Sequence, residues 1–438
     1  MRQRSWFVIA VIALAAITAW PFLAAQRANA SRPYVAPVLP DYLYRDETVA
    51  FYERRIREDP QDQISARMLA GEYMQRYRES LDVGDIVRAL HQAQRALVLQ
   101  PQNNAGALGV IGSAYYALHD FRAALRYETA AHYEEPNDPN PPAQMALLEM
   151  EMGNYELVAH DLTAARRIQS DDPSTWAAQA RYDELSGRNG SARRLMSAAA
   201  AQSDEVSDNS AEARAWYHYR LGEMAFATGD VGTAQREERL AISQFPNFEM
   251  AYRALARLCW AAKDWNCALD AAKRGADILP EPETLGYEAD AQAALGDATG
   301  ARQTQALIFA VERIGNAYRI NDRLLSVYYS EHGVRLDDSL RIARREVQRR
   351  GKEVFAQDTL AWAAAMDGHW NEAYAASLLA TRLHTEDPRI LFHAGMIASH
   401  FGKTGTARQQ LRQALALNPK WDPFYADEAR AALKKLRG

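Results

Sequence analysis

The sequence predicts an all-α fold, an α-solenoid of about ten helix-turn-helix repeats, on three observations. A small residue returns at a dominant spacing of 34 residues. A glycine follows most of these small residues after seven positions, and a second small residue follows after twelve. A pattern that keeps its phase over several units is expected of a repeat array, whereas a generic helical bundle would not maintain it.

The small residue that opens each unit is named the anchor. The ten anchors are Ala70, Gly112, Ala146, Ala180, Gly222, Ala256, Ala289, Ser326, Ala361 and Gly395, of which Ala70 is a degenerate first member. Two steps are 42 residues long, which predicts insertions around RYRESLD (76–82) and in the polar segment QSDEVSDNS (202–210). The Ser326 unit departs most from the pattern, because EHGVRLDDSL (331–340) contains an extra residue.

The residues after each anchor predict two short antiparallel helices. A glycine at the seventh position can adopt the positive φ that ends the first helix; these glycines are Gly153, Gly187, Gly229, Gly296, Gly368 and Gly402. The small residues at the twelfth position let the second helix approach the anchor; they include Ala124, Ala234, Ala268, Ala301, Ala373 and Ala407. A proline at the twenty-fourth position ends the second helix in four units, at Pro136, Pro246, Pro280 and Pro419.

A 34-residue unit with these small residues, turn glycines and closing prolines resembles the tetratricopeptide repeat. The resemblance covers residues 62–419. It implies a right-handed superhelix whose inner groove is lined by the first helices, at positions three before, one after and four after each anchor. The groove residues implied are Tyr116, Leu147, Met150, Arg181, Tyr219, Glu223, Phe226, Arg253, Arg257, Trp260, Trp362, Phe392 and Met396.

Two adjacent units combine the aromatic residues Tyr219, Phe226 and Trp260 with Arg253 and Arg257. Aromatic and arginine side chains are favoured in binding hot spots, because they pair a large buried area with fixed polar geometry. They also suit stacking on sugars. The alternative is that some of these side chains only pack between neighbouring units.

The N-terminus has the pattern of a secretory signal. Arg2 and Arg4 precede an uncharged apolar run over residues 6–25, and Ala28 and Ala30 are small residues of the kind a signal peptidase accepts. We expect a signal peptide over residues 1–30; an uncleaved membrane anchor is the alternative. Either way the rest of the chain is exported, and the frequent Ala and Arg favour the bacterial periplasm. Cleavage would change the formal net charge from -5 to -8.

The repeats, predicted over 46–419, are flanked by distinct segments. Residues 31–45 contain Pro33, Pro37 and Pro40 and predict an extended tether. DETVAFYERRIREDP (46–60) then predicts a helix that corresponds to the second helix of a repeat but has no first helix before it. At the other end, residues 420–438 predict a terminal helix that covers apolar surface of the last repeat.

No common catalytic signature occurs in the chain, so we expect neither an enzyme nor a cofactor. His384, His393 and His400 lie near one another in sequence but lack a companion ligand at metal-binding spacing, so no metal is expected. The 51 basic residues against 56 acidic ones exclude the global basic field that drives non-specific nucleic-acid binding.

Two further features carry predictions. Cys259 and Cys267 flank one predicted turn, and an exported protein would join them in a disulfide; two buried thiols or a redox-active pair are the alternatives. RIARREVQRRGK (341–352) gathers six basic side chains on a helix of the convex side. A solvated charged face is favoured there over a docking patch for acidic lipid or polymer.

A solenoid leaves one long curved groove, so its usual work is to hold another molecule. The sequence therefore predicts an exported scaffold that recognises a protein segment, within an envelope complex, through its groove. The alternative is an adapter in the export or assembly of an envelope polysaccharide. Membrane contact is expected only through the N-terminal segment, if that segment is not cleaved.

Overall fold

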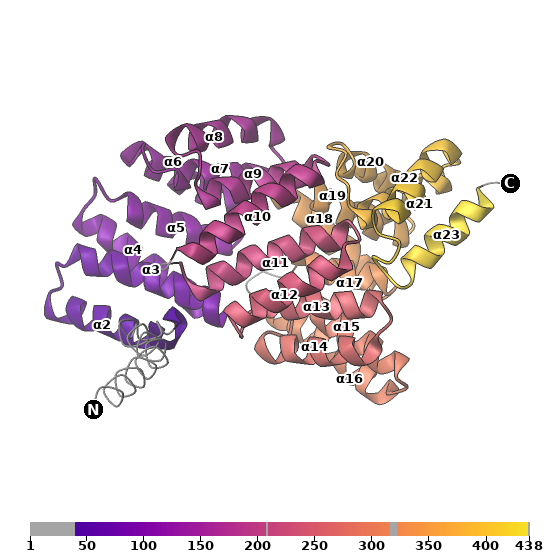
Figure 1. The fold of residues 1–438 in the computed structure, drawn as a ribbon, viewed down its shortest axis with the longest axis horizontal. Coiled ribbons are helices and arrows are strands. Elements are labelled where there is room, and N and C mark those ends of the chain that lie inside the picture. Colours follow the sequence, from indigo (N-terminus) through magenta and orange to yellow (C-terminus); the bar gives the residue numbers. More distant parts are fainter. Residues whose placement is uncertain (1–39, 207–208, 316–321, 437–438) are drawn as a thin grey trace, which may run out of the picture. The chain divides into compact units, whose positions relative to one another are not determined.

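The computed structural model describes residues 40–206, 209–315 and 322–436, and all regular structure in these ranges is helical (Figure 1). The chain divides into two units, Met1–Leu43 and Tyr44–Gly438, and the helical hairpins belong to the second. The predicted signal segment and the predicted tether up to residue 39 lie outside the described residues. In the described ranges, no helix combines the length and the apolar character that a membrane crossing requires.

The helices follow one another along the chain in a single series. They are η1 (Asp41–Tyr44, a 3-10 helix), α2 (Arg45–Glu58), α3 (Gln63–Ser80), α4 (Val83–Leu99), α5 (Ala105–Ala117), α6 (Phe121–Glu134), α7 (Asn140–Glu151), α8 (Tyr155–Ile168), α9 (Pro173–Leu185), α10 (Asn189–Glu205), α11 (Ala211–Ala227), α12 (Val231–Gln244), α13 (Glu249–Ala261), α14 (Trp265–Ile278), α15 (Pro282–Ala294), α16 (Ala298–Gly315), α17 (Asp322–Glu331), α18 (Leu336–Arg350), α19 (Val354–Met366), α20 (Trp370–Ala380), α21 (Pro388–His400), α22 (Thr404–Leu417) and α23 (Tyr425–Lys435).

Successive helices from α3 to α22 form helix-turn-helix hairpins, so the predicted α-solenoid is confirmed. Every predicted anchor is buried, as are the small residues at the twelfth position. The reason is close helix contact: at Gly395, a Cβ atom would lie 2.8 Å from the side chain of Leu411 in the second helix of the same hairpin.

The turns between paired helices also follow the prediction. All six predicted turn glycines have positive φ, between 66° at Gly402 and 89° at Gly296. Sequence reasoning missed that His119 and Lys263 take the same conformation at the corresponding positions, with φ of 58° and 60°. Gly333 does so in the irregular Ser326 unit. The four second helices that precede a predicted closing proline end two residues before it.

The predicted insertions lengthen helices more than loops. α3 has 18 residues and continues through Ser80 before Leu81 turns the chain with φ of 61°. α10 continues through Glu205, well into the segment that the sequence predicts as a polar insertion. The added turn is held in place by His218 of α11, whose Nε2 lies 3.1 Å from Asp204 and whose Nδ1 lies 2.9 Å from Glu237.

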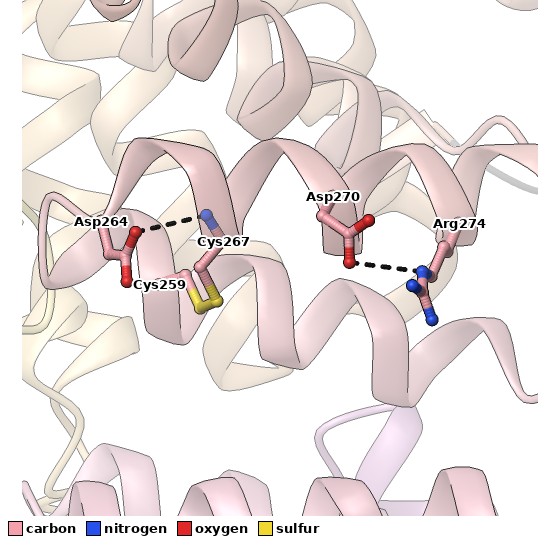
Figure 2. The surroundings of a disulfide bond; sticks show 5 residues. All are labelled: Cys259, Asp264, Cys267, Asp270 and Arg274. Carbon is pink, nitrogen blue, oxygen red and sulfur yellow. Dashed lines mark hydrogen bonds and ion pairs between the residues drawn. A yellow bond between two sulfur atoms is a disulfide. The ribbon is translucent and has the colours of Figure 1, made fainter.

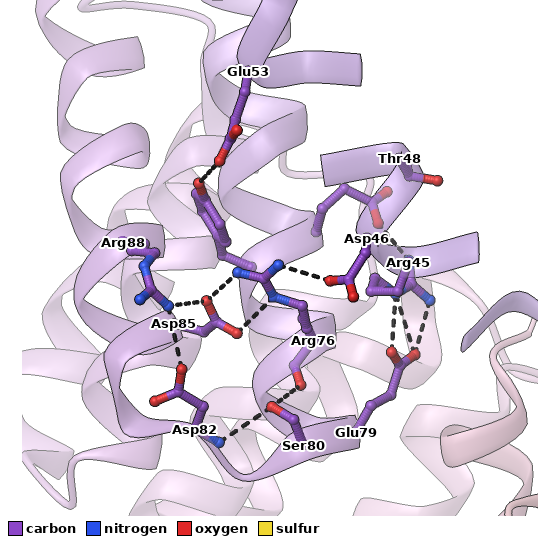
Figure 3. Close-up of polar contacts among 12 residues, drawn as sticks. Arg45, Asp46, Thr48, Glu53, Arg76, Glu79, Ser80, Asp82, Asp85 and Arg88 are labelled. Carbon is purple, nitrogen blue, oxygen red and sulfur yellow. Dashed lines mark hydrogen bonds and ion pairs between the residues drawn. The ribbon is translucent and has the colours of Figure 1, made fainter. Parts of the chain in front are cut away.

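The start of the second unit is tied to the first hairpin by ion pairs (Figure 3). Arg76 of α3 donates to Asp46 of α2 at 2.9 Å and to both carboxylate oxygens of Asp85 of α4 at 2.7 and 2.8 Å. Arg88 also donates to Asp85, at 2.6 Å. Asp85 is buried, and these two guanidinium groups offset the cost of its burial and lower its pKa. α2 is thus fixed against the hairpin that follows it.

The two cysteines form a disulfide within the α13/α14 hairpin, where their Cα atoms are 5.6 Å apart (Figure 2). Cys259 lies near the end of α13 and Cys267 in the first turn of α14, which Asp264 caps by accepting from the Cys267 amide at 3.2 Å. Closing so short a loop lowers the conformational entropy of the unfolded chain. In the chain-entropy model this raises the free energy of unfolding by about 2.5 kcal/mol. The effect is confined to this one hairpin.

Contacts also join hairpins that are about 200 residues apart in sequence, a set named here the turn-to-turn contacts. Thr385 Oγ1 donates to the carbonyl of Leu185 at 2.6 Å, and Asn418 Nδ2 donates to the carbonyl of Phe226 at 2.7 Å. Both donor side chains are buried. In three further contacts, the Val354 amide donates to the Tyr155 hydroxyl, Arg382 donates to the Gly153 carbonyl, and Arg350 forms an ion pair with Glu151.

Turn glycines make this packing close. A Cβ atom on Gly187 would lie 2.5 Å from the carbonyl oxygen of His384, and one on Gly229 would lie 2.9 Å from that of Leu417. Gly153 meets the backbone of residues 352–353 in the same way. In contrast, a Cβ on Gly368 or Gly402 would meet nothing within 4 Å. The turns that follow α7, α9 and α11 therefore pack closely against loops of the second half of the array.

Two glycine anchors make room for a buried carboxyl group. A Cβ on Gly112 or Gly222 would collide with the side chain of Glu128 or Glu238, respectively, each from the second helix of its hairpin. Burial, followed by repulsion from Asp138, raises the pKa of Glu128 to about 8. Burial also raises the pKa of Glu238 far above its ordinary value. Both hairpins therefore pack best when these groups are protonated.

Replacing Glu128 with Gln should remove a pH-dependent part of the stability. Because the folded-state pKa lies above the unfolded one of about 4.5, protonation stabilises the fold fully below pH 4.5. The benefit is lost progressively as the pH rises from about 4.5 through 8. Urea unfolding at pH 5 and pH 8 should show Glu128→Gln within about 1 kcal/mol of wild type at pH 5 and more stable at pH 8, by about 4 kcal/mol.

The matched control is Glu156→Gln, because Glu156 is exposed on α8. Its pH profile should follow that of the wild type. If Glu128→Gln gave no gain at pH 8, the carboxyl group would not be buried against Gly112.

Candidate binding cavity

The first helices of successive hairpins surround a cavity of about 300 Å³. Its lining comes from α9, α11, α13, α15, α17, α19 and α21, together with Trp421 from the segment before α23. Helices far apart in sequence therefore face one another across it: Arg181 of α9 lies over the ring of Phe355 of α19 at 5.1 Å. The turn-to-turn contacts bring these two parts of the array together.

The cavity wall carries six arginines and five carboxylates. Glu184 accepts from Arg181 and from Arg220, at 2.7 Å in each case. Burial opposes ionisation of Glu184, but attraction from Arg220 and then Arg181 outweighs it and lowers the pKa of that carboxyl. All three side chains are thus charged and held in fixed positions.

A second pair joins Arg257 of α13 to Glu223 of α11, and the Arg257 guanidinium also lies 4.4 Å above the ring of Phe226. Burial is the largest single effect and disfavours the charge of Arg257, but Glu223, followed by Tyr287 and Glu283, together outweigh it and raise the pKa of the guanidinium. This places a cation and an aromatic ring together on the wall, with limited freedom for either.

Glu283 of α15 lies between two further arginines, 3.8 Å from Arg253 and 4.0 Å from Arg389. Burial would raise the pKa of Glu283, but Arg253 and then Arg389 lower it to about 2. The remaining two carboxylates have other partners. Asp358 lies 3.0 Å from His393 Nδ1, and Asp387 caps α21 by accepting from the amides of residues 389 and 390.

Five of the nine residues singled out for partner binding line this cavity, and Arg181 of the wider groove set does so too. The five are Tyr219, Glu223, Phe226, Arg253 and Arg257. Trp260 lines a smaller adjoining cavity of about 30 Å³, where its Nε1 donates to Asp290 at 2.9 Å. Tyr116 lies apart from both, and its hydroxyl donates to Glu151 at 3.4 Å.

Trp362 and Phe392 belong to the apolar core beneath the last helix, α23. Trp362 Nε1 donates to the Tyr425 hydroxyl at 3.2 Å, and the Phe392 ring stacks on that of Tyr425 at 4.7 Å. Met396 packs against the same core, while Leu147 and Met150 belong to another apolar cluster. The structure thus places these residues in packing positions and away from the cavity.

Sequence reasoning missed several residues of the wall. Glu184, Arg323 and Asp358 occupy the same positions relative to their anchors that the groove rule uses, so a stricter application of the rule would have found them. Glu283, Phe355 and Arg389 lie six residues before their anchors, a position outside the rule. These three come near the helix N-termini, which face the cavity because the array packs on itself.

Other predicted features lie elsewhere. The arginines of 341–352 belong to α18 and pair with acids: Arg341 with Asp338 and Arg344 with Glu372, each at 2.6 Å. Arg341 and Arg344 are exposed, as a solvated charged face requires, but Arg350 is mostly buried and bonds Glu151 across the array, so the prediction holds for only part of this helix. Within the described ranges, no group of three or more His, Cys, Asp or Glu side chains is arranged to hold a metal ion.

Replacing Glu184 with Gln should destabilise the protein, because it leaves Arg181 and Arg220 charged without their carboxylate. We expect a loss of about 2 to 3 kcal/mol in the free energy of unfolding, as for a mostly buried ion pair. Urea unfolding monitored by circular dichroism measures it. The matched control is Asp270→Asn, which breaks the exposed Arg274 pair shown in Figure 2 and should cost less than about 1 kcal/mol. Equal losses from both would contradict the buried network.

No protein-family profile matches the chain, and no curated protein matches it significantly. Solved structures that are similar to it include PilW, described as a widely conserved type IV pilus biogenesis factor, at 17% identity and a TM-score of 0.40. That similarity covers 47% of this chain and 92% of PilW. Yeast Tom70 is similar at 12% identity and a TM-score of 0.37, over 90% of this chain and 93% of its own. The Cut9–Hcn1 hetero-tetramer of APC/C gives 12% identity and a TM-score of 0.35, over 91% and 95%.

Proposed function

We propose that this protein is an exported binding scaffold that holds a short segment of a partner protein in the cavity between its first helices. The proposal rests on the residue types that line the cavity wall. Tyr219, Phe226, Arg253 and Arg257 line one cavity, and aromatic and arginine side chains are the residue types on which binding energy concentrates.

The size of the cavity favours a segment over a folded partner. A volume of about 300 Å³ is at the lower end of the range for ligand pockets and accepts a few side chains. An extended segment can place such side chains inside while the rest of its chain stays outside. A partner that binds in this way needs no large flat interface.

The ion pairs along the wall favour tight binding by fixing the groups that would contact the segment. Arg257 is held by Glu223, and Arg253 and Arg389 lie on either side of Glu283. Side chains that are already ordered lose little entropy when a partner binds, so more of the contact energy becomes affinity. The turn-to-turn contacts support the same preorganisation by holding α9 close to α19.

The proposed export rests on two features. The N-terminal run after Arg2 and Arg4 has the pattern of a secretory signal. The disulfide between Cys259 and Cys267 suits an oxidising compartment such as the periplasm. A partner in an envelope complex follows from this location.

A peptide-display library panned against the full chain tests the proposed function. We expect enriched peptides to bind the wild type with micromolar Kd, a range typical of short segments, and to lose at least about tenfold in affinity to Tyr219→Ala. Tyr219 lines the cavity, whereas Tyr133 is 87% exposed on α6, so Tyr133→Ala is the matched control and should bind as the wild type does. Circular dichroism checks that both variants fold.

Enrichment of no peptide, or equal binding by Tyr219→Ala and wild type, would overturn the proposed function. Binding of neutral sugar oligomers in place of peptides would support the alternative of a polysaccharide adapter, since aromatic side chains also stack on sugars.

A further inference from the structure

One turn-to-turn contact is made by the loop HTEDP (384–388), called the docked loop, on the turn between α9 and α10, called the occupied turn. Thr385 of this loop is only 4% exposed, and its hydroxyl donates to the Leu185 carbonyl at 2.6 Å. In return, Asn189 at the start of α10 donates to the Glu386 carboxylate at 3.1 Å. The docked loop thus supplies a hydroxyl donor and a carboxylate acceptor.

The loop QSDDP (169–173), called the free loop, has the same chemistry from its second residue on. Ser170 lies 24 residues after its anchor, as Thr385 does. In both loops the Asp-Pro pair that follows has the same task, since the Asp caps the next helix from an extended conformation and the Pro begins that helix. Ser170 and Asp171, however, are exposed. The free loop therefore presents to solvent the donor and the acceptor that the docked loop uses.

The turn between α21 and α22, called the open turn, is the counterpart of the occupied turn. Gly402, Lys403 and Thr404 stand there in place of the glycine, arginine and asparagine of the occupied turn. The two glycines also share a backbone conformation, with φ of 66° at Gly402 and 69° at Gly187. A Cβ atom on Gly187 would lie 2.5 Å from the docked loop, whereas one on Gly402 would meet nothing within 4 Å.

Apolar surface is exposed beside the open turn. Phe401, the residue before its glycine, is 37% exposed, whereas Met152, the residue before the buried Gly153, is 9% exposed. The difference arises because a loop of the second half covers the turn at Gly153. In addition, the last carbonyl groups of a helix lack partners within that helix. The open turn therefore combines apolar surface and acceptors of the kind that a loop covers elsewhere in the molecule.

We propose that the open turn of one molecule binds the free loop of a second copy of this chain. In that contact Ser170 donates to the His400 carbonyl at the end of α21, and Thr404 donates to the Asp171 carboxylate. A second copy is the partner because the chain itself carries a loop of the docked type with its binding groups exposed. The inference does not depend on the proposed function, since no residue of the open turn lines the cavity.

The spacing of the repeats provides a neighbouring contact in the same register. Within the chain, successive turns receive successive loops, because Gly153 meets residues 352–353 and Gly187 meets the docked loop. The loop EPNDP (135–139) precedes the free loop by 34 residues, and Gly368, which is also open, precedes Gly402 by 34. Two such contacts cover a small area, so we expect a weak association with a Kd on the order of 10 to 100 µM.

Sedimentation velocity of the full chain between about 1 and 200 µM, a range that brackets this Kd, tests the proposal. We expect the sedimentation coefficient of the wild type to rise with concentration. Thr404→Glu places a carboxylate opposite Asp171, and Asp171→Lys removes the acceptor, so each variant should associate at least about tenfold more weakly. Glu is favoured in the first turn of a helix, so Thr404→Glu should fold as the wild type does, which circular dichroism checks.

An equimolar mixture of Thr404→Glu and Asp171→Lys should associate as the wild type does. In the mixture, the new carboxylate of one variant meets the new ammonium group of the other, and the remaining turn and loop are both unchanged. Neither variant alone has this match. Recovery on mixing is therefore a result that a general loss of folding in either variant would not give.

The matched controls make the same chemical changes elsewhere. Thr406→Glu lies two positions further along α22, about 200° around the helix axis, and Thr406 is exposed. Glu156→Lys makes the charge change of Asp171→Lys at an exposed position of α8. Both controls should associate as the wild type does.

Three results would overturn the proposal. The first is a wild type that stays monomeric at the highest concentration. The second is an association that neither Thr404→Glu nor Asp171→Lys weakens, because the contact then lies elsewhere on the chain. The third is a mixture of the two variants that fails to recover, because the free loop and the open turn are then not in contact. Peptide binding in the cavity is measured separately, so the proposed function is unaffected by any of them.

Discussion

The arrangement of the array depends on the packing of its second half against the turns of its first. The contacts that do this are few and close: Thr385 and Asn418 donate from buried side chains to carbonyl groups at the ends of α9 and α11. Turn glycines such as Gly187 allow the backbones to approach. A repeat array is otherwise held together by neighbouring units alone. Here contacts between residues about 200 positions apart add a constraint that no single hairpin contains, and the inner cavity follows from it.

The cavity carries charges that the chain has to stabilise. Three glutamates hold five of the six arginines, so desolvation is offset by attraction within the wall. Such pairs contribute little to net stability, because burial costs nearly as much as the attraction returns. They do hold guanidinium groups and aromatic rings in fixed positions around a space too small for a domain. The proposed function assigns a short segment of a partner protein to this space.

The local structure was predictable because it depends on residues close in sequence. The anchors, the turn glycines and the closing prolines each act within one 34-residue unit, and the helices follow them. The wall was predictable only in part. Tyr219, Phe226 and Arg257 follow from a positional rule within each repeat, but Phe355 and Arg389 face the cavity only because distant hairpins meet. Trp362 and Phe392 satisfy the same rule yet lie beneath α23, since the rule does not include the terminal helix. Lys263 takes a positive φ without glycine, which no local signal marks.

The most direct test of the turn-to-turn packing compares Gly187→Ala with Gly402→Ala by urea unfolding. Both glycines have positive φ, 69° and 66°, so both alanines carry the same backbone strain of about 1 kcal/mol. Only at position 187 does the new Cβ meet another backbone, the His384 carbonyl at 2.5 Å, whereas position 402 is open. Gly187→Ala should be less stable than Gly402→Ala by at least about 1 kcal/mol, as for an overpacked contact. Equal losses would contradict it, because the two halves would then not be in contact at this turn.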